Sequence, residues 1–283
     1  MSGPNPARTD QEPASPREII AWAFYDFANS GYTTVVLSTI YSAYFVGVVA
    51  AELDKASPGS ATLWWTLAIG AANLLVLAGS PVLGAIADFR ASKKMFLLVS
   101  SITCVVATAL LATAGPGQVL LAIPLLIVSA VAFTCGESLI AAFLPEIATT
   151  DNMGRISGYG WSLGYFGGML TLACCLAYIN FASGQGHGAE QYVPVTLLIT
   201  ALVFAMTAAP TFLWLGERAR RRPLPPGANY IQAGFKQVLD TLGHASRLPD
   251  LFRFLLCIIL FQAGVSTVVV VAAIYAQEVM NFG

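Results

Sequence analysis

Charged residues are scarce in this sequence. Only 10% of its 283 residues are Asp, Glu, Lys or Arg, whereas 57% are hydrophobic. A soluble globular domain carries roughly 25% charged residues, so the composition indicates that much of the surface faces lipid. Acidic and basic residues nearly balance, and the net charge is −1. We therefore expect no nucleic-acid partner, because binding to nucleic acid needs a basic surface.

Cysteine and histidine are also few and scattered. The five cysteines lie in apolar runs without metal-ligand spacing, which is typical of small core residues rather than of disulfides or zinc ligands. The sequence contains neither the HExxH nor the GxSxG motif, and it has no P-loop and no GxGxxG turn. We therefore expect no metal site, no cofactor and no enzymatic activity.

Long apolar runs are what the sequence has in abundance. Seven stretches are long enough to cross a membrane, which takes about 20 residues as a helix. They cover residues 20–50, 62–87, 95–114, 118–146, 156–182, 193–216 and 251–276. This pattern predicts an all-α, multi-pass membrane protein. Residues 1–17 are polar and rich in proline, and they predict a disordered tail.

The basic residues predict the orientation in the membrane. With the N-terminus in the cytoplasm, thirteen Lys and Arg residues fall on the cytoplasmic side and Lys55 alone falls on the outer side. The sequence shows no cleavable signal peptide. We expect the membrane to be a bacterial inner membrane, or a vacuolar membrane if the source is eukaryotic.

The connector over residues 217–250 is longer and more basic than the others. It opens with the sequence ERARRRPLPPG, and apolar residues then recur at helical spacing. These residues are Ile231, Phe235, Val238, Leu239 and Leu242. They predict an amphipathic helix over residues 229–245. Such a helix either docks under the membrane domain or lies among lipid headgroups.

Polar residues interrupt the first and fourth apolar stretches. Asp26, Asn29, Ser30 and Thr33 have the spacing of one helix face. Asp26 is expected within about one turn of the cytoplasmic end. Glu137 lies about 14 Å along its helix from Glu146, at the cytoplasmic edge, and therefore near the middle of the bilayer. A carboxylate at that depth indicates a functional site, although a protonated structural Glu is the alternative.

Three further features carry candidate residues. Gln262, in the seventh stretch, could line a cavity. Asp88 would lie at a helix C-terminus, where a negative charge opposes the helix dipole, so it should have a cation or a helix N-terminus as its partner. The fifth stretch contains a GxxxGxxxG pattern that allows close helix packing. Its glycines are Gly160, Gly164 and Gly168.

Four stretches together resemble the major facilitator superfamily, and within it the vacuole effluxer-like family. They are WAFYDFANS from Trp22, AFLPEIA from Ala142, ISGYGWSLGYFGG from Ile156 and LPDLFRFL from Leu248. The family includes fungal autophagy-related vacuolar amino-acid effluxers and bacterial permeases. The resemblance implies a secondary active transporter with twelve helices, in two six-helix halves joined by a long cytoplasmic connector.

That architecture implies a division of this chain into four parts. Residues 1–17 form the tail, 18–216 the N-terminal six-helix half, 217–250 the connector, and 251–283 the first helix of the second half. We therefore expect a truncated twelve-helix fold whose partner is the missing C-terminal half. We also expect that this chain alone does not transport.

The resemblance also implies roles for the candidate residues. The first and fourth helices line the central cavity in this superfamily, which places the small-molecule substrate, and H+ as a candidate coupling ion, beside Asp26 and Glu137. The expected pathway adds Asn29, Thr33 and Gln262. The loop with Gly84, Asp88, Arg90 and Lys93 corresponds to a conformational latch, although Phe89, Ala91 and Ser92 depart from its usual pattern.

We expect export of amino acids or similar small polar metabolites. The sequence leaves one alternative from another class open. In that alternative the protein is a non-transporting membrane scaffold or receptor, and the connector with its amphipathic helix binds a partner.

Overall fold

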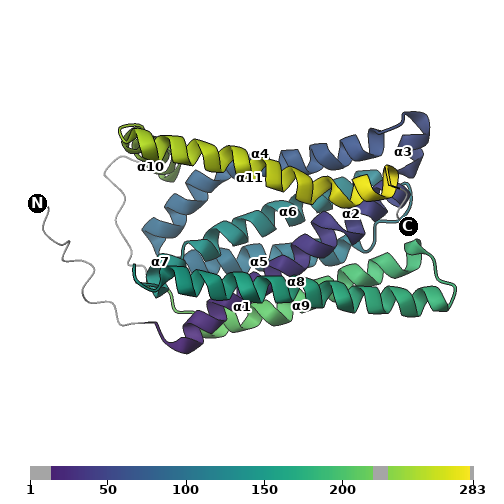
Figure 1. The fold of residues 1–283 in the computed structure, drawn as a ribbon, viewed down its shortest axis with the longest axis horizontal. Helices are drawn as coiled ribbons and strands as arrows, with labels where there is room; N and C mark the ends of the chain where they lie inside the picture. The colour runs from purple at the N-terminus through teal and green to yellow at the C-terminus, as the bar shows by residue number, and fades with distance from the viewer. Residues whose placement is uncertain (1–13, 219–228, 281–283) are drawn as a thin grey trace, which may run out of the picture.

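The fold is that of a computed structural model, which describes residues 14–218 and 229–280. Within these residues every element is helical, and seven helices are long and apolar enough to cross a membrane. This confirms the predicted all-α membrane fold. Most of the predicted tail and the three arginines at 220–222 lie outside the described residues. The long helices run side by side along the longest axis of the molecule (Figure 1).

The order of the elements follows the predicted spans. The first span consists of α1 (Pro16–Tyr32), η2 (Thr33–Ser38), α2 (Ile40–Tyr44) and η3 (Phe45–Val49). The next five are α4 (Ser60–Arg90), α5 (Lys93–Leu111), α6 (Val119–Ala141) with α7 (Leu144–Ile147), α8 (Met153–Gly184) and α9 (Ala189–Trp214). The short α3 (Ala51–Ala56) precedes α4, and α10 (Tyr230–Ala245) and α11 (Pro249–Glu278) follow α9.

The first span is less regular than the sequence predicted. Two π-helical stretches, η2 and η3, replace the single continuous helix, and Thr39 between them departs from helical geometry with φ −125° and ψ −73°. The irregularity begins where β-branched residues follow one another from Thr33 to Val36. Such side chains crowd the preceding turn of a helix.

Helix α1 occupies the centre of the bundle. It packs against α8, α9 and α6, while α5 packs between α6 and α9, and α4 packs on α6. A capping box starts α1: the Ser15 hydroxyl accepts from the backbone N–H of Glu18, and the Glu18 carboxylate accepts from the backbone N–H of Ser15. This satisfies two of the backbone donors that every helix start leaves free.

The glycines of α8 lie against α1. Gly160 faces Trp22 and Asp26, and the next two glycines of the pattern face Ser30. Gly167 is the tightest of these positions, because a Cβ atom there would lie 2.5 Å from the carbonyl oxygen of Phe27. The two backbones can approach this closely because α8 has no side chain at these four glycine positions.

Helix α10 docks on the membrane domain through α4. Gly234 lies so close to the backbone of Pro81 that any side chain at this position would collide with it. One helical turn earlier, the Tyr230 hydroxyl accepts from Nε of Arg90 at 3.2 Å, and the guanidinium lies 5.3 Å from the centre of the tyrosine ring. Of the two sequence-based alternatives for this helix, the structure therefore shows docking.

A substitution at Gly167 tests the α1–α8 packing. We expect Gly167→Ala to lower the free energy of unfolding by about 1–3 kcal/mol, the range for an overpacked site. The closest atoms that the new methyl group meets include backbone atoms, which cannot rotate away. Gly158→Ala is the matched control on the same helix, since a Cβ atom added there would have no neighbouring atom within 4 Å. Equal stability of the two variants in detergent would contradict this packing.

The orientation of the chain stays a prediction that labelling can test. In a cysteine-free background, an impermeant maleimide added to intact cells should label Lys55→Cys. It should label Arg247→Cys only after the membrane is opened. Labelling in the reverse order would show that the N-terminus lies outside.

Candidate functional site

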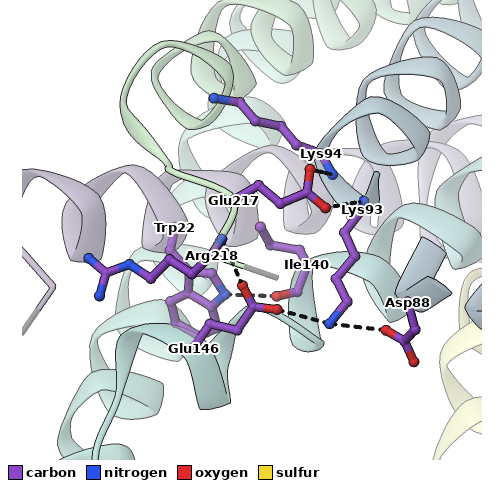
Figure 2. A network of polar contacts seen from close by, with 8 residues as sticks. All are labelled: Trp22, Asp88, Lys93, Lys94, Ile140, Glu146, Glu217 and Arg218. Atoms are coloured by element: carbon purple, nitrogen blue, oxygen red, sulfur yellow. Dashed lines mark hydrogen bonds and ion pairs between the residues drawn. The ribbon is translucent and has the colours of Figure 1, made fainter. Parts of the chain in front are cut away.

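A network of charged groups joins the helix ends that the charge distribution predicts to be cytoplasmic (Figure 2). Lys93, the first residue of α5, lies at its centre. Its Nζ lies 2.9 Å from Oε1 of Glu146 on α7 and 3.2 Å from Oδ1 of Asp88 on α4. The side chains of Lys93 and Glu146 are each only 13% exposed. Lys93 thus links three consecutive spans.

Glu217 caps the start of α5 from a distant part of the chain. Its carboxylate accepts from the backbone N–H groups of Lys93, at 2.6 Å, and Lys94, at 3.3 Å. The Lys94 ammonium donates in return to the carbonyl of Leu215 at 2.6 Å. Ser92, the N-cap residue, provides no side-chain cap. A carboxylate is favoured at this position because the N-terminus of a helix is its positive end.

Arg218 connects the same segment to α1 and α7. Its guanidinium lies 2.9 Å from Oε2 of Glu18, and its backbone N–H donates to Oε2 of Glu146 at 3.4 Å. Sequence reasoning did not identify Glu18, Glu217 or Arg218 as a set. Of the three, only Glu18 could have been identified from the sequence, because it is the fourth residue of a capping-box pattern that begins at Ser15.

The four predicted latch residues divide between two sides of the loop. Asp88 has the cationic partner that its position required, and this partner is Lys93. Arg90 points instead to Tyr230 on α10. Gly84 lines the cavities between α4 and its neighbours. The loop is therefore attached to the first six spans on one side and to the connector helix on the other.

The two intramembrane acids lie on neighbouring helices. The Tyr25 hydroxyl packs directly on Gly136, where a Cβ atom would lie 2.5 Å away. Asp26 and Glu137 are the next residues along the two helices. Asp26 is partly buried against Gly160, whereas Glu137 is exposed at the surface of the chain.

The structure corrects the predicted depth of Asp26. Trp22 on α1 bonds to Ile140 on α6, and Tyr32 on α1 lies against Ser129 on α6, so the two helices run past each other in opposite directions. From the Trp22–Ile140 contact, Asp26 is about 6 Å along α1 and Glu137 is about 4.5 Å along α6 in the same direction. The two acids therefore lie at similar depth. The sequence predicted that Glu137 lies deeper than Asp26, whereas the contacts between α1 and α6 place the two side by side.

The other predicted pathway residues are spread over different surroundings. Asn29 is 4% exposed, and its amide nitrogen and oxygen have no hydrogen-bond partner among the described residues. The Thr33 hydroxyl donates to the carbonyl of Asn29 at 3.1 Å. Gln262 is exposed on α11, which packs mainly on α2, η2 and α10. The structure thus joins Asn29 and Thr33 on the first span, and it places Gln262 on a separate helix that packs on the same span.

Two cavities lie on the α4 side of α6, and the residues that line them include neither Asp26 nor Glu137. The larger, of about 1050 Å³, lies between α4 and α10 and reaches Asp88 and Thr134. The smaller, of about 120 Å³, is lined by Lys93, Cys135 and Ser138. Residues on both sides of Glu137 along α6 therefore border open space. Within residues 14–218 and 229–280, no three His, Cys, Asp or Glu side chains gather as metal ligands would.

Comparison with known proteins places these features in a family context. The sequence profile of the family described as "Vacuole effluxer Atg22 like" matches residues 65–283. An uncharacterized MFS-type transporter, YxiO of Bacillus subtilis, is 27% identical over 263 residues, which are 91% of this chain and 60% of that protein. Autophagy-related protein 22 of Yarrowia lipolytica is 27% identical over 177 residues, covering 54% of this chain and 29% of that protein. No solved structure matches significantly.

The Lys93–Glu146 pair provides a test of the network. We expect Lys93→Met to lower the free energy of unfolding by about 2 kcal/mol or more, because it leaves two carboxylates without their cation. Adding Glu146→Met should recover part of this loss, since the poorly solvated charge is then removed as well. Lys55→Met, which breaks an exposed pair with Glu52, is the control and should change stability by less than about 0.5 kcal/mol. A double variant that is less stable than Lys93→Met alone would contradict the network.

Proposed function

This chain belongs to the vacuole effluxer Atg22-like family, and we propose that it acts in a secondary active transporter that exports amino acids or similar small polar metabolites. The chain spans 60% of the length of the Bacillus subtilis relative. The family description and the name of that relative support transport, and seven apolar helices support an integral membrane protein. Amino acids as the substrate, export as the direction of transport and H+ as the coupling ion are what we propose.

The position and surroundings of Glu137 are the observations on which the proposal depends most. It lies well inside its span, is exposed at the surface of the chain, and has no hydrogen bond or ion pair with a described residue. An ionised carboxylate at membrane depth is unfavourable without a compensating charge. A proton or the amine of a substrate would supply that compensation, so we assign Glu137 the role of proton or amine site.

Asp26 and Asn29 complete the proposed pathway on α1. Asp26 lies at the level of Glu137, so we assign it to the same pathway rather than to a gate at the membrane edge. The Asn29 amide offers a donor and an acceptor that no described residue uses. That combination suits a zwitterion, whose carboxylate accepts and whose ammonium donates hydrogen bonds.

The charged network around Lys93, at the predicted cytoplasmic ends of the helices, would act as the conformational latch. Secondary transporters of this kind move one bundle against the other around a site near the midplane. A set of helix ends joined by Lys93, Glu217 and Arg218 would move as one rigid unit. Breaking the network should therefore affect transport rates more than substrate affinity.

The scaffold alternative receives less support from the structure. Its partner-binding element would be α10, but α10 already contacts α4 through Gly234 and Tyr230. Its cavity-facing residues Phe235, Val238 and Leu242 border the space next to α4. The connector helix therefore has a place within this chain. We propose a bacterial inner membrane as the location, with the N-terminus in the cytoplasm.

Substitution of Glu137 tests the proposed coupling. Because this chain alone is expected not to transport, the test uses vesicles that contain a full-length member of the family with the corresponding substitutions. The vesicles are loaded with labelled amino acids, and efflux is followed at two pH values across a pH gradient. We expect Glu137→Gln to abolish the dependence on the gradient and to lower the coupled rate at least about tenfold, as loss of an essential proton carrier would. An Asp26→Asn variant should also be impaired, because Asp26 shares the depth of Glu137.

Glu190→Gln is the matched control, since Glu190 is an exposed acid at the other end of the bundle, in the first turn of α9. It should keep wild-type efflux. If Glu137→Gln keeps wild-type, gradient-dependent efflux, Glu137 has no coupling role. If the wild-type protein moves none of the amino acids tested, the proposed substrate class is wrong.

A further inference from the structure

Three aromatic residues near the outer end of the first two spans have polar atoms without partners. They are the hydroxyls of Tyr41 and Tyr44 on α2 and the indole N–H of Trp65 on α4. None has a hydrogen-bond partner among the described residues. Tyr41 and Trp65 are 0% exposed and Tyr44 is 4% exposed. We call this set the aromatic cage.

The rings of the cage contact one another directly. The Tyr41 ring centre lies 6.1 Å from that of Tyr44 and 6.2 Å from that of Trp65. Phe45 closes the group, with its ring 5.5 Å from Trp65. The three side chains that carry the unpartnered groups thus belong to one cluster of rings.

Burial of these groups without partners would be unfavourable. Tyr and Trp are common at membrane surfaces because the ring stays in apolar surroundings while the polar atom reaches water. Here the whole side chains are enclosed, so bulk water does not reach them. A buried donor without an acceptor loses its hydrogen bonds to water and gains none in return. Three such groups in one cluster would remove a sizeable part of the net stability of a domain.

The chemistry of the cage restricts what it can bind. All three groups are neutral, and each can donate a hydrogen bond, while the two hydroxyls can also accept one. No cationic side chain within the described residues makes a contact with these rings, so an anion would stay uncompensated there. A water molecule forms about three hydrogen bonds when buried, and it both donates and accepts.

We propose that the aromatic cage is a buried water site, in which enclosed water bonds to the polar atoms of Tyr41, Tyr44 and Trp65. The two π-helical stretches fit this assignment, because they flank α2 on either side. A π-helical turn is wider than an α-helical turn and is frequent at functional sites. The enclosed water would hydrate the interior beside α2. Its hydrogen bonds to the cage could rearrange when the segment formed by η2, α2 and η3 bends.

Removal of single hydroxyls distinguishes a water-bound group from an unpartnered one. If enclosed water bonds to the tyrosines, Tyr41→Phe and Tyr44→Phe each lose a hydrogen bond, and the midpoint of thermal unfolding in detergent should fall by about 2–4 °C. If the hydroxyls have no partner, the same variants remove an unfavourable group, and the midpoint should rise. The sign of the shift therefore decides the question.

Tyr32→Phe is the matched reference. Tyr32 lies on the same span, is 0% exposed, and its hydroxyl is 2.9 Å from the hydroxyl of Ser129, so its removal must break a known hydrogen bond. We expect the cage variants to shift in the same direction as Tyr32→Phe. An unchanged or raised midpoint for both of them would overturn the proposal.

A density map that resolves ordered water gives a second test that does not depend on variants. We expect a peak within about 3 Å of at least two of the three polar atoms, the usual hydrogen-bond distance. In the Tyr41→Phe protein the peak should weaken or move. A wild-type map without a peak, or with an anomalous signal that identifies a halide, would show that the cage is not a water site.

Discussion

The close approach of α1 and α8 is the contact on which the rest of the bundle depends. Gly160, Gly164, Gly167 and Gly168 allow the two backbones to meet, and Gly167 packs directly on the backbone of Phe27. With α1 held at the centre, its remaining faces reach α6 and α9. Trp22 donates to the carbonyl of Ile140 at 2.9 Å, and Tyr25 lies on Gly136. The acids Asp26 and Glu137 therefore share a level because small residues on two other helices let α1 lie close to both.

The membrane accounts for the distribution of polar groups along this bundle. At the predicted cytoplasmic end, water is available and charged side chains can pair around Lys93 while remaining partly solvated. Deeper in the bundle, each polar group needs a hydrogen-bond partner, either from the protein or from a molecule enclosed within it. Tyr25 and Tyr32 meet this need with the hydroxyls of Ser101 and Ser129. Asn29, Glu137 and the aromatic cage are among the groups that do not, and at these three places we propose substrate, proton and water.

Much of the fold could be predicted from the sequence, whereas little of the network could. The seven spans, the GxxxGxxxG face and the amphipathic connector helix are local patterns that apolar runs and helical spacing reveal directly. The Glu217–Lys93 contact joins residues that are 124 positions apart, and no local pattern indicates such a pair. The depth of Asp26 was misjudged for a related reason, since the level of a residue in a membrane depends on which distant helix ends lie beside it.

The sequence by itself determined that this is a multi-pass helical membrane protein of one transporter family, because lipid admits few alternatives for long apolar runs. It also marked Asp26 and Glu137, since acids in such runs are rare. Only the tertiary structure decided which helix the glycines of α8 contact, that α10 docks at Pro81, and which polar groups have no partner. These features depend on distances between helices, and the side chains of several distant segments set those distances together.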